Sequence, residues 1–296
     1  MGNRFKGVLS IVASAFGFAL MAMFVRLCDD YGGPVSSFQK SFFRNAIALV
    51  IAAVVYARGA AARRAAGYAG PSRIGARAVL LLLGRSVAGC VGIFGNFYAL
   101  SKIPIGEAMA LNKTAPFFTV LLSWLFLRER AGVRRFLALA VAFAGVLLVM
   151  RPGFRGVETF PTLCALCGGL GAGIAYTCVR ELGILKVDGA FIVLFFSAFS
   201  CLASLPFMAC GVDPMTWRQV LIMLGAGCGA AIGQFGVTAA YRFAPPREIA
   251  VFDYTNVVFT AGFGFLFFGQ VPDLLSVAGF ALIVLAALYS SRSRES

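Results

Sequence analysis

The sequence predicts an all-α polytopic membrane protein, with ten transmembrane helices arranged as two inverted five-helix repeats. Three observations support this fold class. Of the 296 residues, 60% are hydrophobic and 13% are charged, whereas soluble domains contain about 45 to 50% apolar and about 25% charged residues. Apolar segments of about 20 residues, long enough to span a bilayer, recur along the whole chain. The second half also repeats part of the sequence of the first.

Charged residues, prolines and glycine clusters divide the chain into ten candidate spans. They lie at residues 7–27, 36–57, 78–99, 105–126, 134–150, 160–180, 189–210, 216–240, 247–268 and 273–291. The first apolar run is longer than a signal-peptide core and shows no cleavage site, so we expect it to remain as a span. The connections are short apart from 57–77, and we expect no separate soluble domain.

Basic residues fall mainly on one side of this predicted topology. With the amino terminus in the cytoplasm, 17 Lys and Arg lie in cytoplasmic segments and 5 in outer segments. Membrane proteins show this excess in their cytoplasmic loops. We therefore expect a multi-pass protein of the bacterial inner membrane with both termini in the cytoplasm. The net charge of +14 then reflects topology, and we expect no nucleic-acid partner.

An internal repeat appears when the chain is shifted by 141 residues. Residues 84–130 then align with 225–271 without a gap, and 12 of the 47 positions are identical, which indicates a duplication. We place the first repeat at 5–153 and the second at 158–291. Five spans are an odd number, so the second copy enters the membrane from the opposite side. Inverted repeats are typical of secondary transporters, in which two halves move around a site near the midplane.

Residues 96–153 carry a recognisable pattern. The segment "IPIGEAMALNKTAPFF" has a Pro-x-x-Glu-Ala start and a proline in mid-span, and it is followed by Glu-Arg and a Gly-Val-rich helix. This pattern resembles the EamA domain of the drug/metabolite transporter superfamily. Residues 243–289 resemble the same domain more loosely, with Gln270 in place of Glu129 and Val257 in place of Pro116. The resemblance implies a carrier of small metabolites, a class that includes amino acids, purines, drugs and nucleotide sugars.

Four cations lie inside the predicted spans, namely Lys40, Arg44, Arg85 and Lys113. A charge at the bilayer centre costs about 2.5 to 3.5 kcal/mol on insertion scales, so we expect these side chains to face the bundle interior. Lys40 and Arg44 share one helix face because they are four residues apart. Arg44, Arg85 and Lys113 lie near the midplane when their depth is calculated from the helical rise of about 1.5 Å per residue. The second repeat has no cation at the matching positions. Ala226 and Tyr254 match Arg85 and Lys113 under the 141-residue shift, and Ser197 matches Arg44 when the similar segments 38–44 and 191–197 are aligned.

The three midplane cations meet one acid of comparable depth, Asp253. An unpaired buried charge is costly, and a carboxylate or phosphate on the cargo would pair with it. We therefore hypothesise a cargo with an anionic or zwitterionic head group, of the amino-acid or organic-acid class. Alternatively, the cations form structural ion pairs with Glu107, Asp253 or Glu248, or Lys40 extends to the outer surface. Asp253 itself could neutralise an arginine, bind an amino group or carry a coupling proton.

Polar side chains of the second, third, fourth, eighth and ninth spans complete the candidate cavity. The predicted substrate-binding residues are Arg44, Arg85, Lys113, Asn112, Asp253, Tyr254, Asn256, Lys40, Asn96 and Gln234.

The sequence gives little support for an enzyme or for transport driven by nucleotide hydrolysis. The chain has no His, and the lone Cys164/Cys167 pair is interpreted as packing, so we expect no metal, cofactor or catalytic residue. The glycine-rich stretches 167–173 and 224–236 lie in spans and lack a following Lys-Ser/Thr, which argues against a phosphate loop. A membrane-embedded transferase, a channel or receptor, and a broad-specificity drug or cation effluxer remain alternatives. Transport would use a gradient or exchange, with a coupling proton or an exchanged metabolite, in a monomer or homodimer.

Overall fold

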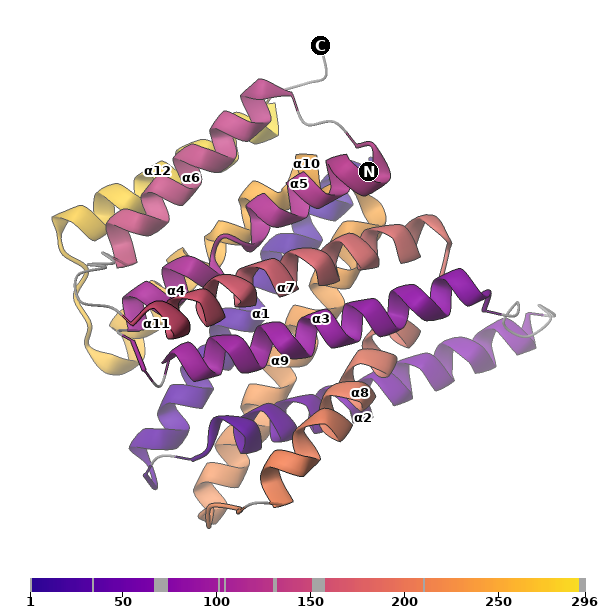
Figure 1. Cartoon of the computed structure of the whole chain (residues 1–296), viewed down its shortest axis with the longest axis horizontal. Helices are drawn as coiled ribbons and strands as arrows, with labels where there is room; N and C mark the ends of the chain where they lie inside the picture. The colour runs from indigo at the N-terminus through magenta and orange to yellow at the C-terminus, as the bar shows by residue number, and fades with distance from the viewer. Residues whose placement is uncertain are drawn as a thin grey trace.

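The computed structural model describes residues 2–33, 35–66, 74–100, 102–103, 105–129, 132–150, 158–209 and 211–292 (Figure 1). Within these ranges the chain forms helices and connections, with no strand. Nine described helical segments are long and apolar enough to cross a membrane, and one further apolar helix is shorter. The predicted fold class is confirmed. Part of the predicted 57–77 connection (67–73), Pro104, and the basic residues Arg73, Arg130, Arg151, Arg155 and Arg294 lie outside the described residues.

The helices follow the predicted order. The first half contains α1 (Asn3–Asp30), α2 (Ser37–Ala65), α3 (Ala76–Leu100), α4 (Ile105–Asn112), α5 (Ala115–Leu127) and α6 (Val133–Met150). The second contains α7 (Thr159–Ile184), α8 (Gly189–Ala209), α9 (Trp217–Phe243), α10 (Pro246–Ile249), the 3-10 helix η1 (Ala250–Tyr254), α11 (Thr255–Phe268) and α12 (Leu274–Arg292). The fourth predicted span is thus α4 with α5, and the ninth is α10, η1 and α11.

One predicted boundary is wrong. Helix α2 continues beyond residue 57 to Ala65, through a stretch that was expected to be a loop. The sequence there is rich in Ala and Arg, which are strong helix formers. The helix therefore continues past the apolar part that the bilayer requires.

The two halves interdigitate rather than form separate bundles. Helix α1 packs along α9, and α3 packs along α7, while α2 contacts α8 and α6 contacts α12 (Figure 1). Each pair joins one helix of each half. Exchanging the halves converts the α1–α9 pair into the α7–α3 pair and leaves the other two pairs unchanged. This pattern is that of a two-fold pseudosymmetric assembly.

Glycines allow the two equivalent pairs to approach closely. A Cβ on Gly17 of α1 would lie 2.6 Å from the amide nitrogen of Gly233 in α9, and one on Gly171 of α7 would lie 2.5 Å from the carbonyl oxygen of Ala88 in α3. Small residues play this role in membrane helix packing. The glycine-rich stretches of α7 and α9 are therefore packing surfaces.

The fourth span of each half is interrupted at the same place. Helix α4 ends just before Lys113 and Thr114, and η1 gives way to α11 at Thr255. Thr114 and Thr255 match under the 141-residue shift. The Thr114 hydroxyl donates to the Leu111 carbonyl at 2.5 Å, and the Thr255 hydroxyl donates to the Phe252 carbonyl at 2.7 Å. Interrupted helices near the midplane are where inverted-repeat transporters place their binding groups.

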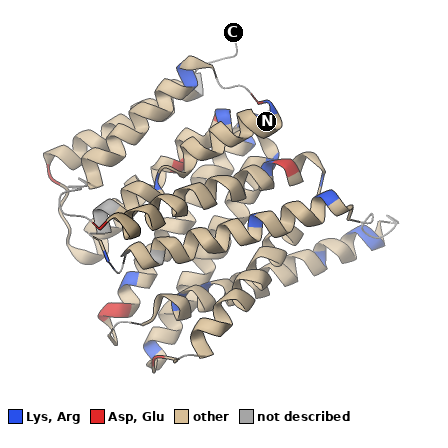
Figure 2. Ribbon diagram, viewed as in Figure 1, with Lys and Arg blue, Asp and Glu red and all other residues tan. Residues whose placement is uncertain are grey.

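The N- and C-termini lie on the same side of the bundle (Figure 1). We call this side the terminal face and the other side the opposite face. Charged residues lie mainly near the ends of the helices (Figure 2). The few charges along the middle of the helices therefore stand out as candidates for function.

Candidate substrate-binding site

Arg85 of α3 is buried between the two halves, with 3% of its surface exposed. Its Nη2 donates to Oε1 of Gln234 in α9 at 3.0 Å, and its guanidinium lies 3.9 Å from the ring centroid of Phe196 in α8. Its Nε and Nη1 atoms are buried and have no hydrogen-bond partner among the described residues. Stacking on a ring holds the guanidinium in place without neutralising it. Three N–H bonds, one on Nε and two on Nη1, therefore remain available to an acceptor.

Arg44 of α2 also has hydrogen-bond donors without a strong acceptor. It is 9% exposed, and its Nη1 donates to the sulfur of Met21 in α1 at 3.5 Å. A thioether is a weak acceptor, and the Arg44 Nε has no partner among the described residues. No described carboxylate lies within ion-pair distance of Arg44 or Arg85. Both positive charges are thus buried without a counter-charge in contact.

Lys113 projects from the interruption between α4 and α5. Its Nζ donates to Oδ1 of Asn256 in α11 at 2.7 Å, and Nδ2 of Asn256 donates to the Ala15 carbonyl of α1 at 2.9 Å. Lys113 also interacts electrostatically with Asp253, although no ion pair joins these two described residues within 4.0 Å. Asn256 therefore couples the interruptions of both halves to α1.

Asp253 lies in η1 and is 8% exposed. Tyr176 of α7 is within electrostatic range of Asp253 and also of Arg85 and Arg44, and its ring stacks on Tyr241 of α9 with centroids 5.3 Å apart. Tyr176 thus belongs to the same polar region as the two arginines and the acid. Sequence reasoning missed it, and also missed Phe196 and Met21. A tyrosine within a glycine-rich span was the only available signal, and it did not identify the charges that Tyr176 would meet.

Asn96 and Asn112 converge on α7. A Cβ on Gly168 would lie 3.1 Å from Nδ2 of Asn112 and 3.4 Å from Cβ of Asn96. The Asn96 Oδ1 is buried without a hydrogen-bond partner among the described residues. Asn96 also lies three helical turns beyond Arg85 on nearly the same face of α3. These amides extend the polar region from Arg85 toward the opposite face.

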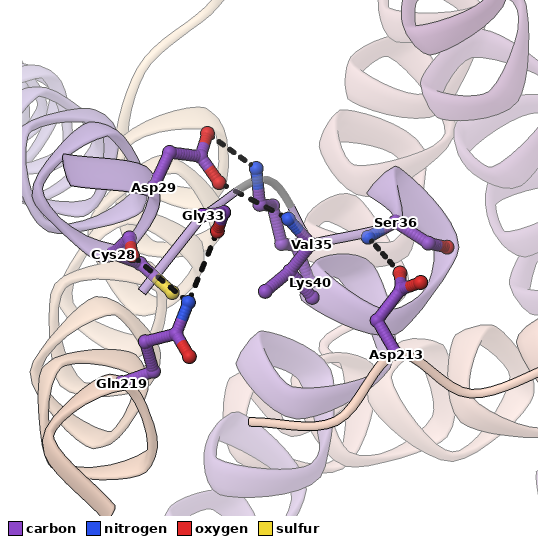
Figure 3. A network of polar contacts seen from close by, with 8 residues as sticks. All are labelled: Cys28, Asp29, Gly33, Val35, Ser36, Lys40, Asp213 and Gln219. Atoms are coloured by element: carbon purple, nitrogen blue, oxygen red, sulfur yellow. Dashed lines mark hydrogen bonds and ion pairs between the residues drawn. The ribbon is translucent and has the colours of Figure 1, made fainter. Parts of the chain in front are cut away.

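The structure places two predicted cavity residues elsewhere. Tyr254 is fully buried in the apolar core, with its ring 6.2 Å from that of Phe143 in α6. Lys40 forms an ion pair with Asp29 at the end of α1, 2.6 Å apart (Figure 3). This ion pair gives Lys40 a structural partner, Asp29, that is not among the acids considered from the sequence. The side chain of Glu107 lies outside the described residues.

Polar contacts join the α1–α2 connection to the α8–α9 connection on the opposite face (Figure 3). The Ser36 amide donates to the Asp213 carboxylate at 2.7 Å. Gln219 is fully buried, and its Nε2 donates to the carbonyls of Cys28 and Gly33, each at 3.1 Å. We call the set the opposite-face network. It comprises Cys28, Asp29, Gly33, Val35, Ser36, Gln39, Lys40, Asp213 and Gln219. These contacts close that end of the bundle.

A cavity of about 400 Å³ lies at the terminal face, between α2, α3, α7, α8 and α9. We call it the terminal-face cavity. Ala78 is part of its wall and lies seven residues before Arg85, on the same face of α3 and about 10 Å away at 1.5 Å per residue. The terminal-face cavity and the opposite-face network therefore lie at opposite ends of the bundle, with Arg85 between them.

Interlocked inverted repeats, interrupted helices and internal charges define a membrane transporter of small solutes. The chain belongs to the EamA-like transporter family, whose sequence model matches residues 5–151 and 159–292. The family membership implied by the sequence pattern is confirmed. The family and its similar members are transporters rather than enzymes, so the expectation of a non-enzyme is also confirmed.

Several relatives are similar over most of the chain. The pseudopaline exporter CntI of Pseudomonas aeruginosa is 31% identical over 98% of this chain and 97% of its own. A riboflavin transporter of Rhizobium johnstonii is 30% identical over 71% of this chain and 70% of its own. Human solute carrier family 35 member G1 is 28% identical over 98% and 79%. One crystal structure, 17% identical, covers 94% of this chain and 97% of its own with a TM-score of 0.76, which supports the fold.

Proposed function

We propose that the protein carries a small metabolite with an anionic or zwitterionic head group, of the amino-acid or organic-acid class, by alternating access. The observation that supports this proposal is the pair of buried arginines without a counter-charge in contact. Removing a guanidinium from water is costly unless an anion compensates for it. A cargo carboxylate can accept from Nε and Nη1 of Arg85 and from Nε of Arg44 through charge-assisted bonds.

The second end of a zwitterion would find its partners at the helix interruptions. Asp253 can accept from an ammonium group, while Asn256 and Lys113 offer further polar contacts. In this arrangement a cargo links a cation-rich region formed by α2 and α3 to the interrupted ninth span. The two repeats, at 5–153 and 158–291, would then close around it in turn.

The named relatives support a small-molecule cargo, and one of them favours export. One of them is an exporter of pseudopaline and another transports riboflavin. Their cargoes differ, so the class of cargo here rests on the arginines rather than on the relatives. The buried carboxylate of Asp253, which forms no ion pair with a described residue, supports a second candidate, a broad-specificity effluxer of drugs or cations.

Orientation follows from the excess of basic residues at the predicted cytoplasmic segments. We place the terminal face in the cytoplasm of a bacterial inner membrane, in a monomer or homodimer that uses a coupling proton or an exchanged metabolite. The terminal-face cavity then opens inward and the opposite-face network closes the outer side.

A fluorescent reporter that matures only in the cytoplasm, fused to the carboxyl terminus, tests this orientation. A fusion without fluorescence would indicate the opposite orientation.

A thermal-shift screen of the purified protein tests the cargo class. Carboxylates and phosphates should raise the melting temperature of the parent, and Arg44→Ala and Arg85→Ala should remove that shift. Arg218→Ala is the matched control because Arg218 lies at the edge of the bundle against Trp217. Stabilisation by organic cations alone would favour the second candidate and reject the anionic cargo.

A further inference from the structure

The terminal-face cavity carries charges of its own, separate from the predicted binding residues. Four basic side chains line it, namely Arg63, Arg77, Lys186 and Arg242. They come from the ends of α2 and α9, the start of α3, and the connection between α7 and α8. Their charges are not equally compensated, and this difference determines what the cavity can bind.

Two of the four are neutralised. Arg63 forms an ion pair with Asp188 at 2.7 Å, and Arg77 forms one with Glu181 of α7. The charged ends of Lys186 and Arg242 form no ion pair or side-chain hydrogen bond with any residue in the described ranges. The cavity therefore has a net positive charge that comes from Lys186 and Arg242.

The fold leaves room for the Arg242 side chain. A Cβ on Gly183 of α7 would lie 2.8 Å from Cγ of Arg242, and a Cβ on Gly189 of α8 would lie 2.7 Å from its Nη1. Larger residues at these two positions would displace the side chain. The last turn of α7 and the start of α8 thus leave space for the Arg242 side chain along the cavity wall.

Lys186 has a backbone conformation that favours glycine. Its φ is +57°, and its amide donates to the Gly183 carbonyl at the end of α7. When residues 38–44 are aligned with 191–197, Lys186 matches Gly33, whose φ is +89°. Glycine adopts positive φ without steric cost. A lysine at this position therefore strains the backbone, and this cost points to a role for its side chain.

We propose that the terminal-face cavity is the first binding site for the anionic group of the cargo, a carboxylate or phosphate, which Lys186 and Arg242 hold before it reaches Arg85. This inference rests on the proposed function, since it concerns the same cargo. The cavity is open to water on the terminal face and lies about 10 Å from Arg85 along α3. Two unpaired cations at the mouth of a low-dielectric cavity also raise the local concentration of anions.

Protection of an introduced thiol tests the proposal without knowledge of the cargo. Leu185 lines the cavity and is 39% exposed, so Leu185→Cys offers a reactive reporter. Its modification by N-ethylmaleimide is followed by mass spectrometry at constant ionic strength, with citrate as the anionic probe and choline as the cationic one. The parent chain, treated in parallel, gives the background from native cysteines.

Citrate should slow modification of Leu185→Cys, and choline should not. Adding Lys186→Gln or Arg242→Gln should raise the citrate concentration for half-protection about tenfold, the effect of losing one charged hydrogen bond. Arg64→Gln, a neutralisation at an exposed position of α2 that does not line the cavity, should leave it unchanged. Equal protection in all variants, or none in the parent, overturns the proposal.

Two further arms separate alternative explanations. The measurement is repeated in lipid-free detergent and in nanodiscs with phosphatidylglycerol. Protection by the lipid but not by citrate would assign the cavity to a lipid headgroup and overturn the proposal.

Arg85→Ala should retain citrate protection at Leu185→Cys while losing the thermal shift. If Arg85→Ala removes citrate protection at Leu185→Cys, the cavity is not a separate binding site and this inference is rejected. If Arg85→Ala keeps the thermal shift, the proposed function is rejected instead.

Discussion

At the residue scale, the central feature is how Arg85 is held. Phe196 supports its guanidinium by stacking and Gln234 accepts one hydrogen bond, so the charge is positioned but not neutralised. An ion pair would have neutralised the same side chain and weakened its attraction for an anionic ligand. The environment of Lys40 illustrates that contrast, because Asp29 neutralises it directly.

Arg85→Lys should separate the charge from the geometry. Lysine keeps the positive charge but cannot stack on Phe196 or donate through a planar fork. We expect the affinity for a stabilising carboxylate to fall about tenfold to a hundredfold, which corresponds to about 1.5 to 3 kcal/mol. Titrations of the thermal shift measure this loss, with Arg218→Lys as the control. Unchanged affinity would mean that charge alone binds the ligand.

Lys186→Gly should stabilise the protein by up to about 1 kcal/mol, because glycine adopts φ of +57° without strain. Gly33→Ala should have the opposite effect, since Gly33 has a φ of +89°. Thermal unfolding in detergent measures both changes. A destabilised Lys186→Gly would show that the lysine side chain supports the fold rather than the ligand.

At the scale of elements, the fourth and ninth spans share one design. Each is interrupted after the same turn, and equivalent threonine hydroxyls donate to the carbonyls of Leu111 and Phe252, three residues earlier. The difference lies in the side chains at the break. The first half presents Lys113 there, and the second half presents Asp253 one position earlier in the repeat. A symmetric backbone thus carries an asymmetric set of charges.

Thr114→Val and Thr255→Val should destabilise the protein by similar amounts, about 0.5 to 1.5 kcal/mol each, because each removes one hydrogen bond at an equivalent break. Thr162→Val is the matched control, since its hydroxyl donates to the Glu158 carbonyl on an exposed turn and water can replace it. Thermal unfolding gives the comparison. A large effect in one half only would contradict the equivalence of the two interruptions.

At the scale of the whole molecule, the pairs α1–α9 and α3–α7 cross between the halves, so a movement of one repeat changes both ends of the bundle. The opposite-face network joins α1 and α2 to α9 and to the segment before it. It must separate for a cargo to leave on that side. The terminal-face cavity is already open in this conformation.

Gln219→Ala should favour opening of the opposite face, because it removes the two hydrogen bonds that the Gln219 amide donates to the carbonyls of Cys28 and Gly33. Loss of about 1 to 3 kcal/mol would raise the open population about fivefold to more than a hundredfold. Cys28 is a fully buried native thiol in this network, and its modification rate by N-ethylmaleimide reports the opening.

Arg218→Ala provides the neighbouring control for Cys28 modification, because its side chain stacks on Trp217 and not on the network. An unchanged Cys28 rate in Gln219→Ala would mean that these hydrogen bonds do not hold the opposite face closed.

The amino-acid sequence alone was sufficient for the number and order of spans, the inverted repeat and the burial of Arg44 and Arg85. These properties depend on the length of apolar runs and on the cost of charge in a bilayer, both of which are local. Which groups surround each cation depends instead on packing between helices far apart in the sequence. Lys40 meets Asp29, Arg44 meets Met21, and Arg85 meets Phe196 only because the two halves interlock. The same packing turns Tyr254 into the apolar core and brings Tyr176 among the charges.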